Sequence, residues 1–228
     1  MCLNNKGFAI TTILYGLLLM ATLILFLLIG NLSFERRTTD EFVENIKNEL
    51  NGFTNINDTS NIIIVKEDGT YSGVLKDINN HNVAVGDEIK LITPINENYL
   101  ISIKDNNITH ATPMILLLNN NSDSQSFTIR PSTTDTYYYI ATFSNPGFVM
   151  DIAGGSTELN TKIQLYTTDD VPAQKWQFVE TDKVGVYTIR SALGTCMDLF
   201  SALASGGSAI NSYDCNNSNA QKWKVLKV

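Results

Sequence analysis

A small set of polar and aromatic residues recurs at a fixed interval in the C-terminal half of the chain. Asp151 and Asp198 occupy matching places, as do Tyr166 and Tyr213, when the tetrapeptide Ala-Gln-Lys-Trp at Ala173 is laid over its second copy 47 residues later. A carboxylate accepts charge-assisted hydrogen bonds, and an aromatic face packs on apolar surface. Because no catalytic constellation accompanies these residues, they indicate noncovalent recognition and not an enzyme.

The remaining chemistry-bearing residues point to no further class of function. His81 and His110 are isolated from any nucleophile or ligand spacing and are expected to be surface or turn residues, and Asp169 and Asp170 are expected in a solvated turn. We expect no metal and no cofactor. The formal net charge of −7 and a pI near 4.8 give no electrostatic support for binding nucleic acid.

The repeat extends to a third, eroded copy. The two Trp-containing copies align without a gap, and a shift of 49 residues upstream from Gln174 reaches Gln125, where Phe127 takes the place of the Trp. In this first copy, apolar positions survive and polar positions are lost. The residues that stand in place of the Asp, the amide and the Tyr are Ser102, Ile115 and Leu117.

The elements that must position these residues are short strands. Apolar runs broken by Gly, Asn, Ser and Asp, with alternation such as "KIQLY" and "VYTIR", are typical of strands and tight turns. Units of about 45 residues are too small to bury a core singly, but three of them make a domain of about 140 residues. We therefore predict an all-β domain in which three repeats close into a threefold arrangement.

These repeats resemble those of the ricin B-type lectin family, a β-trefoil in which a Gln-x-Trp motif closes each repeat. The resemblance covers residues 88–228, strongly for the last two repeats and weakly for the first. It implies that Trp176, Trp223 and Phe127 are core residues near the pseudo-threefold axis and do not contact sugar.

The same resemblance implies a shallow sugar pocket in the second and third repeats, with glycans or cell-wall polysaccharide as partners. The pocket uses an Asp, an amide about 13 residues later and an aromatic two residues beyond, and a Gln would orient the Asp from behind. Asn often precedes the Gln-x-Trp in that family, whereas this chain has Ala173 and Ala220, which alters the sugar preference. The alternative is that all three repeats are scaffold alone. The implied carbohydrate-binding residues are Asp151, Gln164, Tyr166 and Gln174 in the second repeat, and Asp198, Asn211, Tyr213 and Gln221 in the third.

Two of the three cysteines, Cys196 and Cys215, stand where that family has a disulfide within the repeat. Such a bridge would stabilise the fold by roughly 3 kcal/mol in the loop-entropy picture, and it requires an oxidising location.

The N-terminus predicts such a location. Residues 8–34 contain no charged side chain and, at 27 residues, are long enough to cross a bilayer as a helix. The basic leader favours a cytoplasmic N-terminus and an extracellular C-terminal domain, so we expect a single-pass protein of the cell membrane. A secretory signal peptide is the alternative, but the apolar run is too long and has no small-x-small cleavage site.

The stretch "NNKGFAITTILYG" also resembles the N-terminus of type IV prepilins. That resemblance implies cleavage between Gly7 and Phe8 by a prepilin peptidase, with pilin-like subunits as possible partners. Pilins usually carry Glu at the fifth mature position, where this chain has Thr12. A minor pilin or pseudopilin subunit that does not bind sugar is therefore the alternative to a membrane-anchored lectin.

The predicted organisation is a leader at 1–7, a transmembrane helix and stalk at 8–52, a linker or small β region at 53–87 and the trefoil at 88–228. Within 53–87, the stretch "NIIIVKEDGTYSGVL" predicts a hairpin that turns at Asp68 and Gly69. Three interpretations of this region stay open from the sequence: a linker, a small pilin-like sheet or a part of the trefoil.

Overall fold

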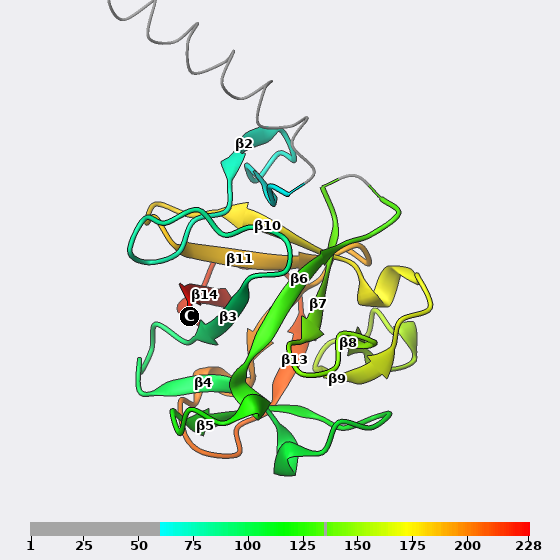
Figure 1. The fold of residues 1–228 in the computed structure, drawn as a ribbon. Coiled ribbons are helices and arrows are strands. Elements are labelled where there is room, and N and C mark those ends of the chain that lie inside the picture. Colours follow the sequence, from blue (N-terminus) through cyan, green and yellow to red (C-terminus); the bar gives the residue numbers. More distant parts are fainter. Residues whose placement is uncertain (1–59, 135) are drawn as a thin grey trace, which may run out of the picture. The chain divides into compact units, whose positions relative to one another are not determined.

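The computed structural model describes residues 60–134 and 136–228 (Figure 1). The strands of this part are β1 (Ile63–Val65), β2 (Tyr71–Val74), β3 (Glu88–Ile92), β4 (Tyr99–Ile103), β5 (Met114–Leu118), β6 (Phe127–Pro131), β7 (Tyr138–Thr142), β8 (Phe148–Ile152), β9 (Thr161–Thr167), β10 (Trp176–Glu180), β11 (Val186–Ser191), β12 (Cys196–Leu199), β13 (Ile210–Tyr213) and β14 (Lys222–Lys227). Single-turn 3-10 helices lie between them: η1 (Lys104–Asn106), η2 (Asp123–Gln125), η3 (Ala153–Gly155), η4 (Pro172–Gln174), η5 (Phe200–Ala202) and η6 (Asn219–Gln221). The predicted all-β class is confirmed for this part of the chain.

Strands β3 to β14 form three consecutive repeats of four strands each. The first and fourth strands of every repeat pair with one another and with the neighbouring repeats, in the closed cycle β3-β6-β7-β10-β11-β14-β3. The second and third strands of each repeat form the hairpins β4-β5, β8-β9 and β12-β13. Closure leaves the barrel without a free edge, which is the trefoil arrangement that the three repeats predict.

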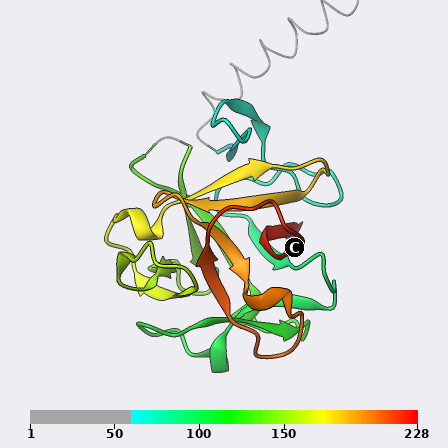
Figure 2. The same ribbon diagram turned by 180° about the vertical axis from the view of Figure 1, so that it is seen from behind.

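The third repeat is seen best from behind, where its strands run from orange to red (Figure 2). The repeats are also joined by their hairpin loops, each of which docks on the next repeat around the cycle. The docking residue has a positive φ in all three copies, and its backbone N–H donates to a carbonyl of the neighbouring third strand. These bonds run from Ala111 to Leu165, from Asn160 to Ser212 and from Gly207 to Leu116.

The aromatic residue of each Gln-x-Trp position lies in the core. Phe127, Trp176 and Trp223 are fully buried in one hydrophobic cluster. The two indole N–H groups are satisfied, since they donate to the carbonyl oxygens of Met150 and Met197 at 3.0 and 3.1 Å. Their burial with satisfied donors fits a structural and not a ligand-contacting role.

Residues 60–87 share the core of the repeats. Strand β1 pairs in parallel with β10, and β2 pairs with β1 across the turn at Gly69, which confirms the predicted hairpin. Ile62, Leu75 and Val83 are buried in the same cluster as the two Trp residues. Of the three interpretations left open by the sequence, this packing favours a part of the trefoil domain.

The disulfide between Cys196 and Cys215 is confirmed, with 5.1 Å between the Cα atoms. It joins the start of β12 to the segment that follows β13 and therefore fastens the hairpin of the third repeat.

The predicted leader, the cleavage site at Gly7 and Phe8, and the transmembrane helix and stalk at 8–52 lie outside the described residues. Within the described residues, no helix is long and apolar enough to cross a membrane.

Candidate functional site

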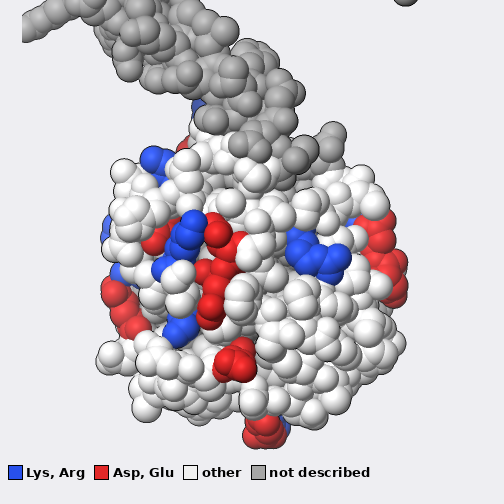
Figure 3. All heavy atoms as spheres, in the orientation of Figure 1, with Lys and Arg blue, Asp and Glu red and all other residues white. Residues whose placement is uncertain are grey.

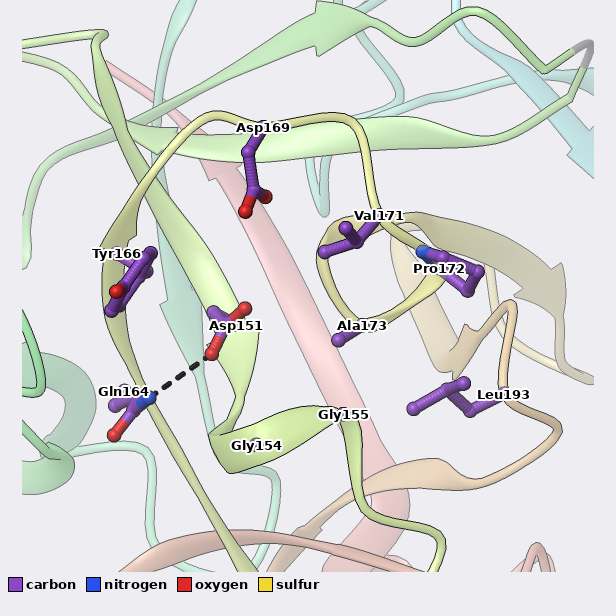
Figure 4. A pocket seen from close by; sticks show the side chains of 10 residues that line it. All are labelled: Asp151, Gly154, Gly155, Gln164, Tyr166, Asp169, Val171, Pro172, Ala173 and Leu193. Atoms are coloured by element: carbon purple, nitrogen blue, oxygen red, sulfur yellow. Dashed lines mark hydrogen bonds between the residues drawn. The ribbon is translucent and has the colours of Figure 1, made fainter.

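The second repeat brings its predicted residues together on one hairpin. Asp151 in β8 and Gln164 in β9 are direct partners across the antiparallel pair, and the Gln164 Nε2 group donates to the Asp151 Oδ1 atom at 3.1 Å. Tyr166 follows two residues later and so lies on the same face of the strand. All three side chains line one cavity of about 400 Å³, shown in Figure 4. We call this cavity the repeat-two site.

Loops from two repeats complete the walls of the repeat-two site. Gly154 and Gly155 of η3 line the site without side chains, and Leu193 reaches it from the third repeat, from the turn between β11 and β12. Asp169 extends from the loop after β9 toward Asp151 (Figure 4). The remaining lining residues are Val171, Pro172 and Ala173.

The Asp151 carboxyl group is held in a partly desolvated position. Its side chain is buried, and this burial raises the pKa of Asp151. Hydrogen bonds from Gln164 and Gln174 act in the opposite direction, while the negative charge of Asp169 raises the pKa further. The Asp151 Oδ1 atom accepts one hydrogen bond from Gln164, and a carboxylate can accept about four, so a ligand rich in hydroxyl groups can donate to the remaining positions.

The Gln of the Gln-x-Trp position clamps the loop that flanks each site. In the second repeat, the Gln174 Oε1 atom accepts from the Asp169 backbone N–H at 3.0 Å, and its Nε2 group donates to the Thr167 carbonyl at 2.9 Å. Gln221 makes the same pair of bonds in the third repeat, and so does Gln125 in the first. Because these side chains are fully buried, they position the site and do not contact a ligand.

The third repeat forms a corresponding cavity of about 330 Å³, which we call the repeat-three site. Asp198 and Tyr213 line it, and burial raises the pKa of Asp198 while a hydrogen bond from Gln221 lowers it. Asn211 lies opposite Asp198 in the strand register but does not line the cavity. The residues that complete the lining are Asn160, Phe200, Ser201, Ala202, Asn216, Ser218 and Ala220.

The first repeat keeps the geometry without the polar groups. Ser102 and Ile115 are direct partners across β4 and β5, where the second repeat has Asp151 and Gln164. The Ser102 hydroxyl is buried and already bonded, since it donates to the Leu100 carbonyl and accepts from the Gln125 side chain. This copy therefore offers no carboxylate or amide to a ligand.

Several residues at or beside the two sites could not be identified from the sequence. His110 is an exposed turn residue, as expected, but it also stacks on Tyr166 with ring centroids 4.4 Å apart, because the loop of the first repeat docks there. In the repeat-three site, Asn160 arrives by the equivalent loop of the second repeat, and the exposed Phe200 adds a second aromatic ring. The alignment of the repeats places Asn160 opposite Ala111 and so shows that the two loops are equivalent. It does not show which site each loop completes.

Asp170 is exposed in a loop, as expected, but its carboxylate also joins a network of bonds. The Asp170 carboxylate lies 3.0 Å from the Lys175 Nζ atom and accepts hydrogen bonds from Thr133 and Tyr139. These bonds hold the pKa of Asp170 well below its usual range, and burial together with the Asp170 charge raises the pKa of Tyr139 to about 12. The network fixes the loop that carries Asp169 into the repeat-two site.

The described residues contain no arranged metal site, and the charges on one face are mixed. No group of three or more His, Cys, Asp or Glu side chains is arranged for a metal ion within residues 60–134 and 136–228. On the face drawn in Figure 3, basic and acidic side chains are interspersed over this part, and large areas are uncharged.

The comparisons with known proteins agree with the fold. Residues 172–228 match the family model described as "Ricin-type beta-trefoil lectin domain-like". A comparison with curated proteins finds no match.

Similar solved structures include the designed threefold-symmetric protein ThreeFoil, with a TM-score of 0.58, 18% identity, and coverage of 62% of this chain and 99% of that one. The exo-beta-1,3-galactanase 1,3Gal43A of Clostridium thermocellum has a TM-score of 0.59 and 21% identity over 70% of this chain, but the match spans only 32% of the galactanase. The ricin B-like lectin of Macrolepiota procera, solved in complex with lactose, has a TM-score of 0.53 and 14% identity over 64% of this chain and 99% of the lectin. At these identities the likeness concerns the fold alone, which is that of a β-trefoil.

Proposed function

We propose that this protein is a non-catalytic carbohydrate-binding protein whose trefoil binds sugars at the repeat-two and repeat-three sites. The observation that carries the proposal is the pair of Asp151 and Gln164, hydrogen-bonded across β8 and β9 beside Tyr166 in an open cavity. The match of residues 172–228 to a lectin-like family model supports it.

The chemistry of the repeat-two site suits a pyranose ring. A carboxylate can accept hydrogen bonds from two hydroxyl groups, and the Gln164 amide, which uses one donor on Asp151, retains an acceptor and a further donor. The face of Tyr166 provides a flat apolar surface for the C–H face of the ring. The repeat-three site is lined by Asp198, Tyr213 and Phe200, so it also offers a carboxylate and aromatic rings to a sugar.

The direct test is a glycan array with the full-length protein, followed by titration of the best ligand. Asp151→Ala combined with Asp198→Ala removes the charged acceptor from both sites. A hydrogen bond to a charged group contributes about 1.5–3 kcal/mol, so the affinity should fall by at least about tenfold. Ser102→Ala is the matched control in the eroded repeat and should leave the affinity unchanged. Equal binding by the double variant and the wild type would refute the proposal.

We further propose that the uncharged segment at 8–34 anchors the chain in the cell membrane and presents the trefoil outside the cell. The length of that segment and the disulfide between Cys196 and Cys215, which requires an oxidising compartment, support this topology. A place in a pilus-like fibre, after cleavage by a prepilin peptidase, is the alternative for the N-terminal segment.

A further inference from the structure

The two proposed sites share a framework but differ in charge at one position. Asp169 lines the repeat-two site, and Asn216, 47 residues later, lines the repeat-three site. The interval is the one that separates Asp151 from Asp198, so the two positions are structural equivalents. Each backbone N–H donates to the clamping Gln of its own repeat, Gln174 or Gln221.

The repeat-two site therefore contains two carboxylates, and the second is uncommitted. Asp169 is exposed, and no hydrogen bond or ion pair joins its carboxylate to any residue that the structure describes. Its side chain extends into the cavity toward Asp151 (Figure 4). None of the residues that line this cavity is Lys, Arg or His. The nearby basic residues are His110, which stacks on Tyr166, and Lys175, which is already paired with Asp170.

The repeat-three site has a single carboxylate, that of Asp198. The other polar residues of its lining are uncharged amides and hydroxyl groups: Asn216 replaces the second carboxylate, and Asn160 enters from the second repeat. The Asn216 side chain is also committed locally, because its Oδ1 atom accepts from the Ser218 backbone N–H at 3.0 Å. The lining of this cavity also contains no basic residue.

Two carboxylates in one cavity without a cation leave a charge that a ligand must balance. An ammonium group carries a positive charge and three hydrogen-bond donors, so it can pair with Asp169. A hydroxyl group of the same sugar ring can then donate to Asp151. A sugar carboxylate or sulfate would instead meet like charge. Gly154 and Gly155 leave room beside the ring, where the repeat-three site has Ser201 and Ala202.

We infer that the two sites have different ligands: the repeat-two site prefers sugars that carry a free ammonium group, while the repeat-three site prefers neutral or N-acetylated sugars. This inference rests on the proposed function, because it specifies the ligand class of the same two sites. A partly deacetylated polysaccharide carries both kinds of sugar, so it contains the preferred ligand of each site.

The test isolates each site in the full-length protein. Asp198→Ala leaves the repeat-two site, and Asp151→Ala leaves the repeat-three site. Each variant is titrated calorimetrically with glucosamine and N-acetylglucosamine, and with galactosamine and N-acetylgalactosamine, at about pH 7, above the usual pKa of a carboxyl group and below that of an amine. The measured quantity is the ratio of the two dissociation constants within each pair of sugars. Thermal unfolding verifies that every variant is folded.

The ratio should favour the ammonium sugar by about fivefold at the repeat-two site, the upper range for an exposed ion pair, and should shrink as salt is added. Asp169→Asn should abolish the preference, and Asn216→Asp should create it in the repeat-three site. If the N-acetylated sugars bind but neither substitution changes the ratio, the inference is wrong and the proposed function stands. If none of the four sugars binds either site and the glycan array is also negative, the proposed function fails and the inference fails with it.

Discussion

The disulfide of the third repeat allows a stability prediction with an internal control. Cys196 and Cys215 correspond, 47 residues earlier, to Val149 and Thr168, the pair that the second repeat uses at the same places without a cross-link. Val149 and Cys196 are both fully buried. The double substitution Cys196→Val with Cys215→Thr therefore removes the covalent bond while keeping a pair that this fold already accepts.

The magnitude follows from the length of the closed loop. The two cysteines are separated by 19 positions in the sequence, and in the chain-entropy model a loop of that length corresponds to about 3 kcal/mol at 25 °C. For a domain of this size, each kcal/mol shifts the unfolding midpoint by about 2–4 °C, so the melting temperature should fall by about 6–12 °C. Cys196 also lies opposite Tyr213 in the strand register, so sugar affinity should weaken at the repeat-three site more than at the repeat-two site.

Calorimetry and urea unfolding of the full-length protein, with and without a thiol reductant, measure the effect. The reductant should lower the stability of the wild type toward that of the variant and leave the variant unchanged. A loss below about 1 kcal/mol would contradict the loop-entropy estimate. An equal loss of affinity at both sites would contradict a local effect of the disulfide on the repeat-three site.

Three further predictions concern the sites and the N-terminus. Burial raises the pKa of Asp151 in the folded state, so ionisation of this group destabilises the fold. The contribution of Asp151 to the free energy of unfolding should therefore fall as the pH rises from about 4 toward neutrality, and Asp151→Asn should remove this contribution from urea unfolding curves. His110→Ala should weaken binding at the repeat-two site by about two- to tenfold, the range for one aromatic pair, while His110→Phe retains the affinity and the repeat-three site is unaffected. If a prepilin peptidase processes the chain, N-terminal sequencing from native membranes should find Phe8 first, and Gly7→Leu should block this cleavage; Met1 or Cys2 at the mature start would contradict it.

The sequence alone determined the repeated architecture, because each repeat carries its own local pattern. Alternating apolar residues predict strands, and the Gln-x-Trp interval predicts three units that share a core. The eroded copy was identified by Gln125 at the matching interval, Phe127 at the Trp position and the retained apolar positions. The pair of Asp151 with Gln164 also follows from the sequence once the resemblance is accepted, since both residues belong to one hairpin.

Only the tertiary structure decided which residues of different repeats contact one another. Leu193 and Asn160 enter sites of repeats other than their own, and His110 stacks on an aromatic ring more than fifty positions away in the sequence. Likewise, β1 pairs with β10 across more than a hundred residues, so the sequence could not assign residues 60–87 to the core. Periodicity and spacing report only on neighbours along the chain, whereas these contacts depend on how closure of the barrel brings separate loops together.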